Sequence, residues 1–93
     1  MNDMKKAVVT VLGIDKKGII ARVSGILFEH DANILDIHQT VISDYFNMVL
    51  IADISSDACR FEALSEAIQA LGEEMGLQIR IQRSEIFEAM HQV

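Results

Sequence analysis

The stretch VLGIDKKGIIARVSGILFEH, residues 11–30, decides the fold, because one short polar turn joins a strand-like run to a helix-like run. Residues 5–14 read as a first strand, because Val8, Val9, Val11 and Leu12 form a nearly continuous apolar and largely β-branched run. After DKKG, apolar residues recur at helical spacing from about Gly18 to His30. The apolar stripe of this predicted helix is Ile19, Ile20, Val23, Ile26 and Leu27.

A hairpin is predicted next. HDAN, residues 30–33, closes the helix, and Asn33 suits a helix-ending turn because asparagine tolerates the left-handed conformation. Residues 34–42 and 46–54 read as two strands, joined by the tight turn Ser43-Asp44. In the first of these strands Gln39 interrupts an alternating apolar face.

A second helix and a last strand complete the chain. SSD, residues 55–57, is typical of a helix start, and Gly76 is placed to end the helix after Met75. Residues 77–83 alternate cleanly, with Leu77, Ile79 and Ile81 predicted to point inward.

The order β-α-β-β-α-β predicts an α+β, ferredoxin-like fold: a four-stranded antiparallel sheet with two helices on one face and a short C-terminal tail. The first and third strands are central in this topology, which explains why they are apolar on both sides. The uncovered face would expose Val8, Leu12 or their alternates, together with part of residues 48–52. Such a patch predicts an oligomer, or a tail (residues 84–93) that folds over it.

Composition limits the classes of function. The 93 residues suggest a single domain with its core at about 6–83, and the net charge of −6 argues against nucleic-acid binding. Cys59 is the single cysteine and has no partner for an internal disulfide. No run approaches the ~20 apolar residues of a membrane span, and the start has no secretion signal. A cytoplasmic protein that binds neither membrane nor nucleic acid is expected.

Each known function of this fold needs particular residues at particular places. An RNA-binding module needs several aromatic residues on the central strands and a basic surface, whereas here Phe46 is the only such aromatic and the surface is acidic. The first loop lacks the paired thiols of a metallochaperone. That loop also lacks the arginine with which an acylphosphatase holds phosphate, and it carries Lys16 and Lys17 instead. His38 and Asp36 could share a face of their strand, and we interpret them as a solvated pair on the sheet surface. We therefore expect no enzyme, no catalytic residue, no metal site and no cofactor.

VLGIDKKGIIARVSGILFEHDANILDI, residues 11–37, resembles the signature of an ACT domain. The signature is an apolar strand, a Gly-x-Asp-x-x-Gly-apolar turn, an amphipathic helix, then Asn-Ile and a second strand. The matching residues are Gly13, Asp15, Gly18, Ile19, Asn33 and Ile34, and Phe46-Asn47-Met48 fits the family's third strand. The tail resembles the ending of a small group of stand-alone ACT-domain proteins of uncharacterised function.

The resemblance implies a regulatory module that binds a small molecule, commonly an amino acid, between the first loop of one domain and the second strand of its neighbour. Free amides near Gly18 would receive a carboxylate, and Asp15 would pair with an ammonium group. Asn33 would bind either group. Gly13 would belong to the same loop, and Ile14, Ile19 and Ile34 would line an apolar pocket.

Structural interpretations of these residues stay open beside the functional ones. Asp15 would cap the helix, Gly18 would fit the turn, and Asn33 would occupy a left-handed position. Three functions are carried forward: a homodimeric sensor that regulates a separate partner protein, a ligand-free protein–protein interaction module, and a small hydrolase or isomerase. A related form of the interaction module is a component of a transcriptional regulatory system. It rests on a resemblance to the paired ACT domains of the glycine-cleavage repressor.

Overall fold

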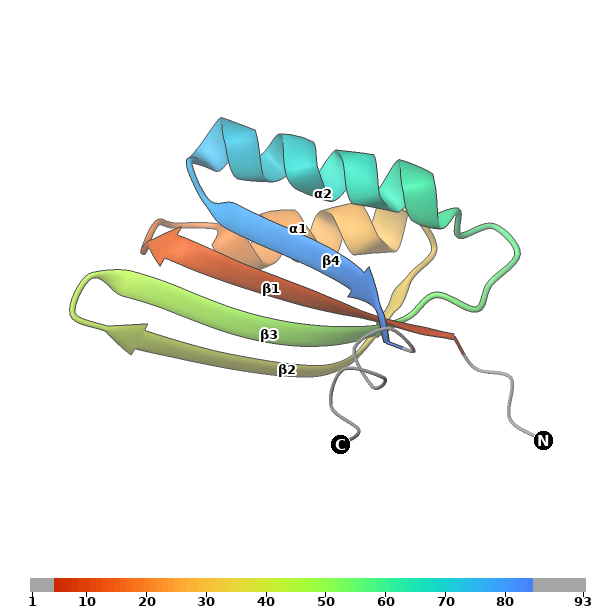
Figure 1. Cartoon of the computed structure of the whole chain (residues 1–93), viewed down its shortest axis with the longest axis horizontal. Helices are drawn as coiled ribbons and strands as arrows, with labels where there is room; N and C mark the ends of the chain where they lie inside the picture. The colour runs from red at the N-terminus through yellow and green to blue at the C-terminus, as the bar shows by residue number, and fades with distance from the viewer. Residues whose placement is uncertain (1–4, 85–93) are drawn as a thin grey trace.

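The computed structural model describes residues 5–84, and their elements follow the order β-α-β-β-α-β (Figure 1). The strands are β1 (Lys6–Ile14), β2 (Asn33–Ile42), β3 (Tyr45–Asp53) and β4 (Gln78–Arg83). The helices are α1 (Ile19–Glu29) and α2 (Phe61–Met75). The ferredoxin-like arrangement predicted from the sequence is confirmed.

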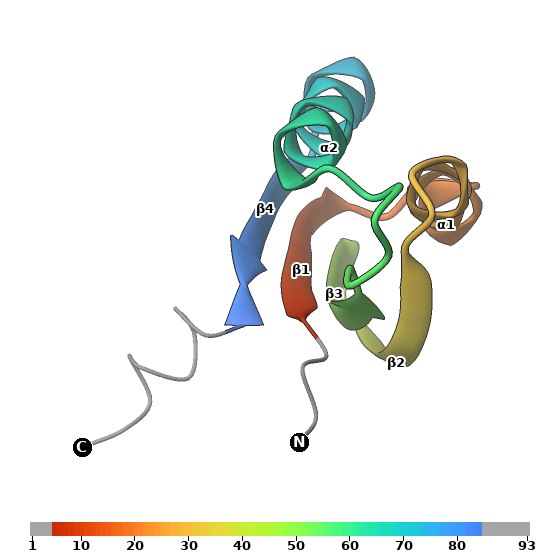
Figure 2. The same cartoon turned by 90° about the vertical axis from the view of Figure 1, so that its right-hand side faces the viewer.

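The four strands form one antiparallel sheet in the order β2-β3-β1-β4, so β1 and β3 are central as predicted. Val9 lies opposite Leu50, and Val11 lies opposite Met48. Because directly opposed residues share a face, these pairs define the side of the sheet that meets the helices. Figure 2 shows both helices on that side, with α1 nearer β2 and α2 nearer β4.

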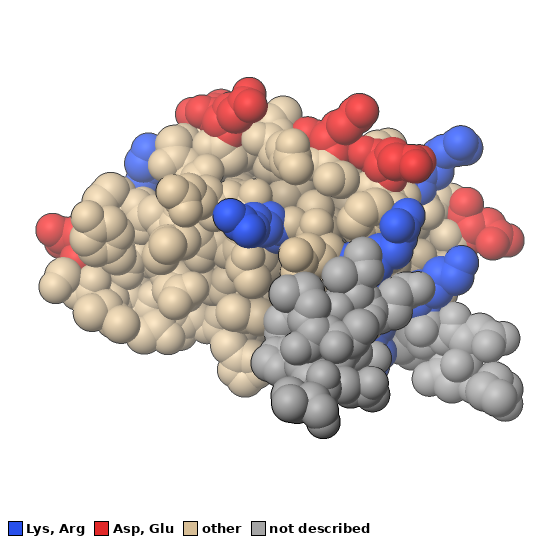
Figure 3. All heavy atoms as spheres, in the orientation of Figure 1, with Lys and Arg blue, Asp and Glu red and all other residues tan. Residues whose placement is uncertain are grey.

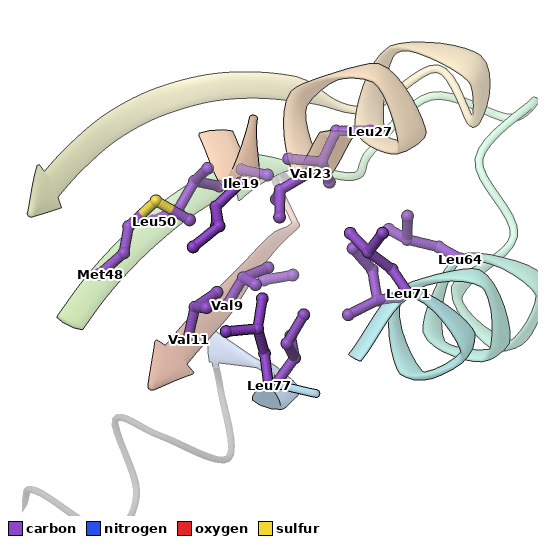
Figure 4. Packing of buried hydrophobic residues seen from close by; sticks show 14 of the residues in the cluster. Val9, Val11, Ile19, Val23, Leu27, Met48, Leu50, Leu64, Leu71 and Leu77 are labelled. Atoms are coloured by element: carbon purple, nitrogen blue, oxygen red, sulfur yellow. The ribbon is translucent and has the colours of Figure 1, made fainter. Parts of the chain in front are cut away.

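The core lies between the helices and this face. Figure 4 shows Val9, Val11, Met48 and Leu50 pointing from the sheet toward side chains of α1 and α2. From the helices come Ile19, Val23, Leu27, Leu64, Ile68 and Leu71. Leu77 and Ile79 are buried and Ile81 packs partly buried against the same cluster, which confirms the predicted inward side of β4.

The opposite face of the sheet carries no helix of the described chain and displays apolar side chains. Ile14, Tyr45 and Ile42 lie opposite one another in a row across β1, β3 and β2, and all three are exposed. Leu12 is also exposed there, whereas Val8, predicted for this face, is only 6% exposed. Figure 3 looks onto this face and shows few charged side chains toward the hairpin end. Residues 85–93 of the predicted tail lie outside the described residues.

Two local predictions are wrong. The left-handed residue after α1 is Asp31, with φ 61°, while Asn33 already begins β2. Aspartate also tolerates this conformation, so either residue suited the turn. The Ser-Ser-Asp segment does not start α2, which begins at Phe61. Its serines form local turns instead: Ser56 Oγ accepts from Ala58 N–H at 3.1 Å.

The other ends behave as predicted. Gly76 follows α2 with φ 69°, and its N–H donates to the Gly72 carbonyl. Ser43, with φ 56°, and Asp44 turn the β2–β3 hairpin. Within residues 5–84, no helix has the length and apolar character needed to cross a lipid bilayer.

Candidate functional site

A cleft of about 610 Å³ opens beside the first turn of α1. Its walls are the β1–α1 loop with the start of α1 on one side and the last part of β2 on the other. The lining residues are Asp15, Lys16, Gly18, Ile19, Ile20, Ala21, Gln39, Thr40, Val41 and Phe46. Two segments that are separate in sequence, residues 15–21 and 39–46, therefore meet at one end of the sheet.

Sheet register explains this position. Phe46 of β3 lies opposite Val41 of β2 and opposite Gly13 of β1, so all three strands reach the same end together. The Asp15 N–H donates to the Asp44 carbonyl at 2.8 Å, which ties the β1–α1 loop to the hairpin turn. The loop is thus held against β2 and cannot swing away without losing a backbone hydrogen bond.

The start of α1 forms one wall of the cleft. Gly18 is its N-cap with φ 83°, and a Cβ added there would meet nothing within 4 Å. No side chain of residues 5–84 caps this helix, so the interpretation of Asp15 as its cap is not supported. Free first-turn N–H groups and the positive end of the helix dipole attract a carboxylate or phosphate.

The cleft also carries one charge of each sign. Asp15 and Lys16 are both exposed and both line it. Lys16 additionally reaches the far end of α2, where its Nζ donates to the Met75 carbonyl at 2.5 Å. A neighbouring ion pair joins the helices, with Arg22 of α1 at 2.9 Å from both carboxylate oxygens of Glu74. The β1–α1 region is therefore linked to the last turn of α2.

Three of the predicted site residues lie at the cleft: Asp15, Gly18 and Ile19. Ile19 is only 2% exposed and packs into the core, so it forms the floor and leaves little surface for a ligand. Gly13 and Ile14 line a separate hollow of about 280 Å³ with Tyr45 and Gly76. At Gly13 a Cβ would stand 2.5 Å from Leu77 Cδ2, so a larger residue there would require the Leu77 side chain to shift.

Asn33 and Ile34 are at the other end of β2. They pair with Asp53 and Ala52, at the end of the sheet where β1 begins with Lys6. The eleven residues of α1, roughly 16 Å of helix, separate them from the cleft. Within one chain the structure does not bring Asn33 to Gly18.

Several lining residues were not predicted: Lys16, Ile20, Ala21, Gln39, Thr40, Val41 and Phe46. One of them, Gln39, could have been found from the sequence. It interrupts the apolar alternation of β2, which indicates that a polar side chain is needed on that face. Its register opposite Met48 puts it on the helix side, where it lines the cleft. The position of β2 beside α1 comes from the tertiary fold, which local sequence patterns do not contain.

At the other end of the sheet, polar groups organise the β3–α2 loop. Asp53 accepts from the Ser55 hydroxyl and from its N–H (2.9 Å), and Ser56 donates to Asp31. The Ser55 hydroxyl, then its N–H, then the charge of Lys6 lower the pKa of Asp53. Partial burial, and then the carboxylates of Asp31 and Asp53, raise the pKa of the Cys59 thiol. These contacts hold the loop, and among residues 5–84 no three His, Cys, Asp or Glu side chains group to hold a metal ion.

β2 is exposed on both faces along nearly its whole length. Among the described strands it pairs only with β3, so its outer edge has free N–H and C=O groups. Ile37 and Val41 face the helix side, opposite Leu50 and Phe46, yet they are 37% and 52% exposed. The helices leave this edge of the sheet uncovered. Long apolar edges of this kind attract a further strand.

Comparison with known proteins gives a consistent result. The ACT domain family model matches residues 5–82. A UPF0237 protein of Methanococcus maripaludis is 42% identical over 90 residues, which are 97% of this chain and 100% of the relative. The solved structure of an ACT domain protein from Streptococcus pneumoniae has a TM-score of 0.76 and 42% identity, covering 92% of this chain and 97% of that one. The regulatory subunit of aspartate kinase from Thermus thermophilus shares the fold, with a TM-score of 0.65 and 23% identity, over 86% of this chain and 52% of that one.

Proposed function

The chain belongs to the ACT-domain family, a family of ligand-binding regulatory modules, and on this premise we propose that it senses an amino acid as a homodimer and regulates a separate protein. The observation that carries the proposal is the cleft at the start of α1. It combines an uncapped helix N-terminus with one acidic and one basic side chain.

These groups match the two charges of an α-amino acid. The carboxylate would accept hydrogen bonds from the first-turn N–H groups of α1. Lys16 Nζ would add a further hydrogen bond after turning from the Met75 carbonyl, to which it donates in the structure. The ammonium group would lie against the Asp15 carboxylate, with Gln39 and Thr40 as further polar partners. Ile20 and Val41 offer apolar surface for the side chain of the ligand. A single copy leaves this cleft wide open to solvent on the β2 side.

A second copy would complete the site. When two β2 edges pair antiparallel about a two-fold axis, the sheet becomes continuous and all helices stay on one face. This symmetry places the Asn33 end of one β2 beside the Ile42 end of the other. Asn33 and Ile34 of the neighbour would then approach the cleft that holds Asp15 and Gly18. The proposal thus explains why one chain keeps the predicted site residues apart.

Regulation would work through a preference of the ligand for one state of the partner complex. The β1–α1 loop is suited to pass on binding, because Lys16 also contacts the last turn of α2. We assign no catalytic role to the chain and no cofactor. The cytoplasmic location stays a prediction.

The test is a thermal-shift screen of the dimer against the twenty amino acids. A ligand at ~100 times its Kd stabilises the folded state by about 2.7 kcal/mol, which raises the Tm of a domain this size by about 10–20 °C. We expect one or a few amino acids to do so, and Asp15→Asn and Lys16→Gln to abolish the shift. Lys17→Gln, in the same exposed loop, is the control. A flat screen, or a shift that survives in both cleft variants, contradicts the proposal.

The second candidate is a ligand-free interaction module, favoured by the exposed apolar edge of β2. It requires pairing through that edge with no saturable binding of a small molecule. A charge introduced on the edge, such as Ile37→Lys, would then abolish partner binding. Cleft variants such as Lys16→Gln would leave it unchanged.

A further inference from the structure

Phe28 is the most exposed large hydrophobic side chain among residues 5–84, with 83% of its surface free. It lies in the last turn of α1, away from the buried stripe of Ile19, Val23 and Leu27. At 100° per residue, Phe28 lies about 20° around the helix from Ala21, which lines the cleft, and about 40° from Ser24. A free phenylalanine ring is unfavourable in water, since burial of a Phe removes 150–250 Å² of surface from solvent.

Phe28 cannot reach the cleft of its own chain. It stands eight residues after Ile20, roughly 12 Å along the helix axis. The chain folds back after α1, so Phe28 lies at the Asn33 end of β2, while Ile20 lies at the Val41 end. The two-fold pairing of β2 edges exchanges these ends. It carries Phe28 of one copy to the cleft of the other.

We infer that Phe28 of each copy closes the ligand cleft of its partner copy, its ring packed against Ile20 and Val41. The inference rests on the proposed function and adds to it a residue that determines specificity. The second copy is the occupant to which the inference commits, for two reasons. Its β2 is an edge strand with exposed apolar side chains, and its α1 brings an unburied ring to a cleft with half-exposed apolar walls. Val41, 52% exposed on the helix side of β2, would gain the cover that its own chain does not provide.

An aromatic cover would also select the ligand. It excludes water from the charged groups at Asp15, Lys16 and the start of α1, which strengthens their interaction with a zwitterion. It leaves limited volume beside Ile20 and Val41, so amino acids with small or medium apolar side chains are expected to bind in preference to charged ones.

Disulfide trapping tests the geometry without any ligand. Phe28→Cys and Val41→Cys are combined in a Cys59→Ser background, and the oxidised protein is run on a non-reducing gel. Because bridged residues need Cα atoms within about 7 Å, a bond within one chain is excluded by the length of α1. A covalent dimer is expected. Glu29→Cys with Val41→Cys is the matched control, since Glu29 faces the groove beside Arg22 and Gly25. Equal dimer yield from both pairs, or loss of thiols without dimer, overturns the inference.

Binding gives a second readout. Phe28→Ala is expected to raise the dimer dissociation constant at least tenfold in sedimentation experiments, with Glu29→Ala within twofold. For any amino acid found in the screen, a mixed dimer of an Ala21→Trp chain and a Phe28→Ala chain should recover one intact site, although neither homodimer binds. Failure to recover binding places Phe28 outside the partner's cleft. A trapped dimer without any amino-acid binding would contradict the sensor function and support the proposed interface. Amino-acid binding without a trapped dimer would support the sensor function and contradict the proposed position of Phe28.

Discussion

Lys16 of the β1–α1 loop donates a hydrogen bond from its Nζ to the carbonyl of Met75, the last residue of α2, at 2.5 Å. The last turn of α2, residues 72–75, contains two glutamates and no basic residue, so its own charges oppose the helix dipole. Lys16 supplies the missing cation from a distant part of the chain.

We therefore expect Lys16→Met to lower the free energy of unfolding by about 0.3–1 kcal/mol, the range of a cation at an exposed helix C-terminus. Urea denaturation measures this, and added salt should shrink the effect. Lys17→Met, one residue further along the loop, should change stability by less than half as much. Equal losses in the two variants would mean that the contact contributes nothing specific.

Two helical glycines should respond to alanine in opposite directions. At Gly25 a Cβ meets nothing within 4 Å, so Gly25→Ala should stabilise the protein by up to about 1 kcal/mol through helix propensity. At Gly72 a Cβ would stand 2.9 Å from the Leu77 carbonyl oxygen, so Gly72→Ala should destabilise by about 1–3 kcal/mol. Thermal denaturation of Gly25→Ala and Gly72→Ala tests both predictions. A change of Tm with the same sign in both variants would contradict the close packing of α2 on β4.

The free energy of unfolding should depend on pH through Asp53. Its pKa is lowered in the folded state, first by the Ser55 hydroxyl, so its contribution is present above the ordinary aspartate pKa and is lost as pH falls through the lower folded value. The stability difference between wild type and Asp53→Asn should be constant near neutrality and shrink below about pH 4. Asp57→Asn, in the same loop, is the control. A difference that grows on acidification would reverse the assigned sign.

Cys59 should be a slow nucleophile. Partial burial and the nearby carboxylates of Asp31 and Asp53 raise its pKa, and the thiolate is the reactive form. Alkylation by iodoacetamide at pH 8 should be slower in the folded protein than in urea, with a pH profile displaced upward. Asp31→Asn should move that profile part of the way back. A folded-state rate equal to that of the unfolded chain would show that the thiol is free of these influences.

Much of the fold was predictable because each element carries its own period. The stripe of Ile19, Val23 and Leu27 predicted α1, and the alternation of Ile79 and Ile81 predicted β4. The errors occurred where two local solutions have similar energies. Asp31 and Asn33 both tolerate a left-handed turn, and Ser55 and Ser56 form turns as readily as they cap a helix.

The site was less predictable than the fold. Asp15 and Gly18 belong to a local motif, and the structure places both at the cleft. Gln39 and Val41 reach it through sheet register and through the position of α1 over β2, which no short stretch of sequence specifies. Asn33 belongs to the other end of β2, so its proposed role depends on symmetry between two chains.

The two edges of the sheet differ, and the difference sets where assembly would stop. β2 presents ten residues, with exposed leucine, isoleucine and valine beside Asp36 and His38, whereas β4 presents six, with Arg80 and two glutamines on the open face and Arg83 stacked over Phe61. A pair joined through β2 has only β4 at its two outer borders, and charged, short borders discourage a further strand. Addition of further chains at the sheet edges would therefore stop at the dimer. The exposed apolar edge of β2 would then be covered, and the protein would not form fibres through it at high concentration.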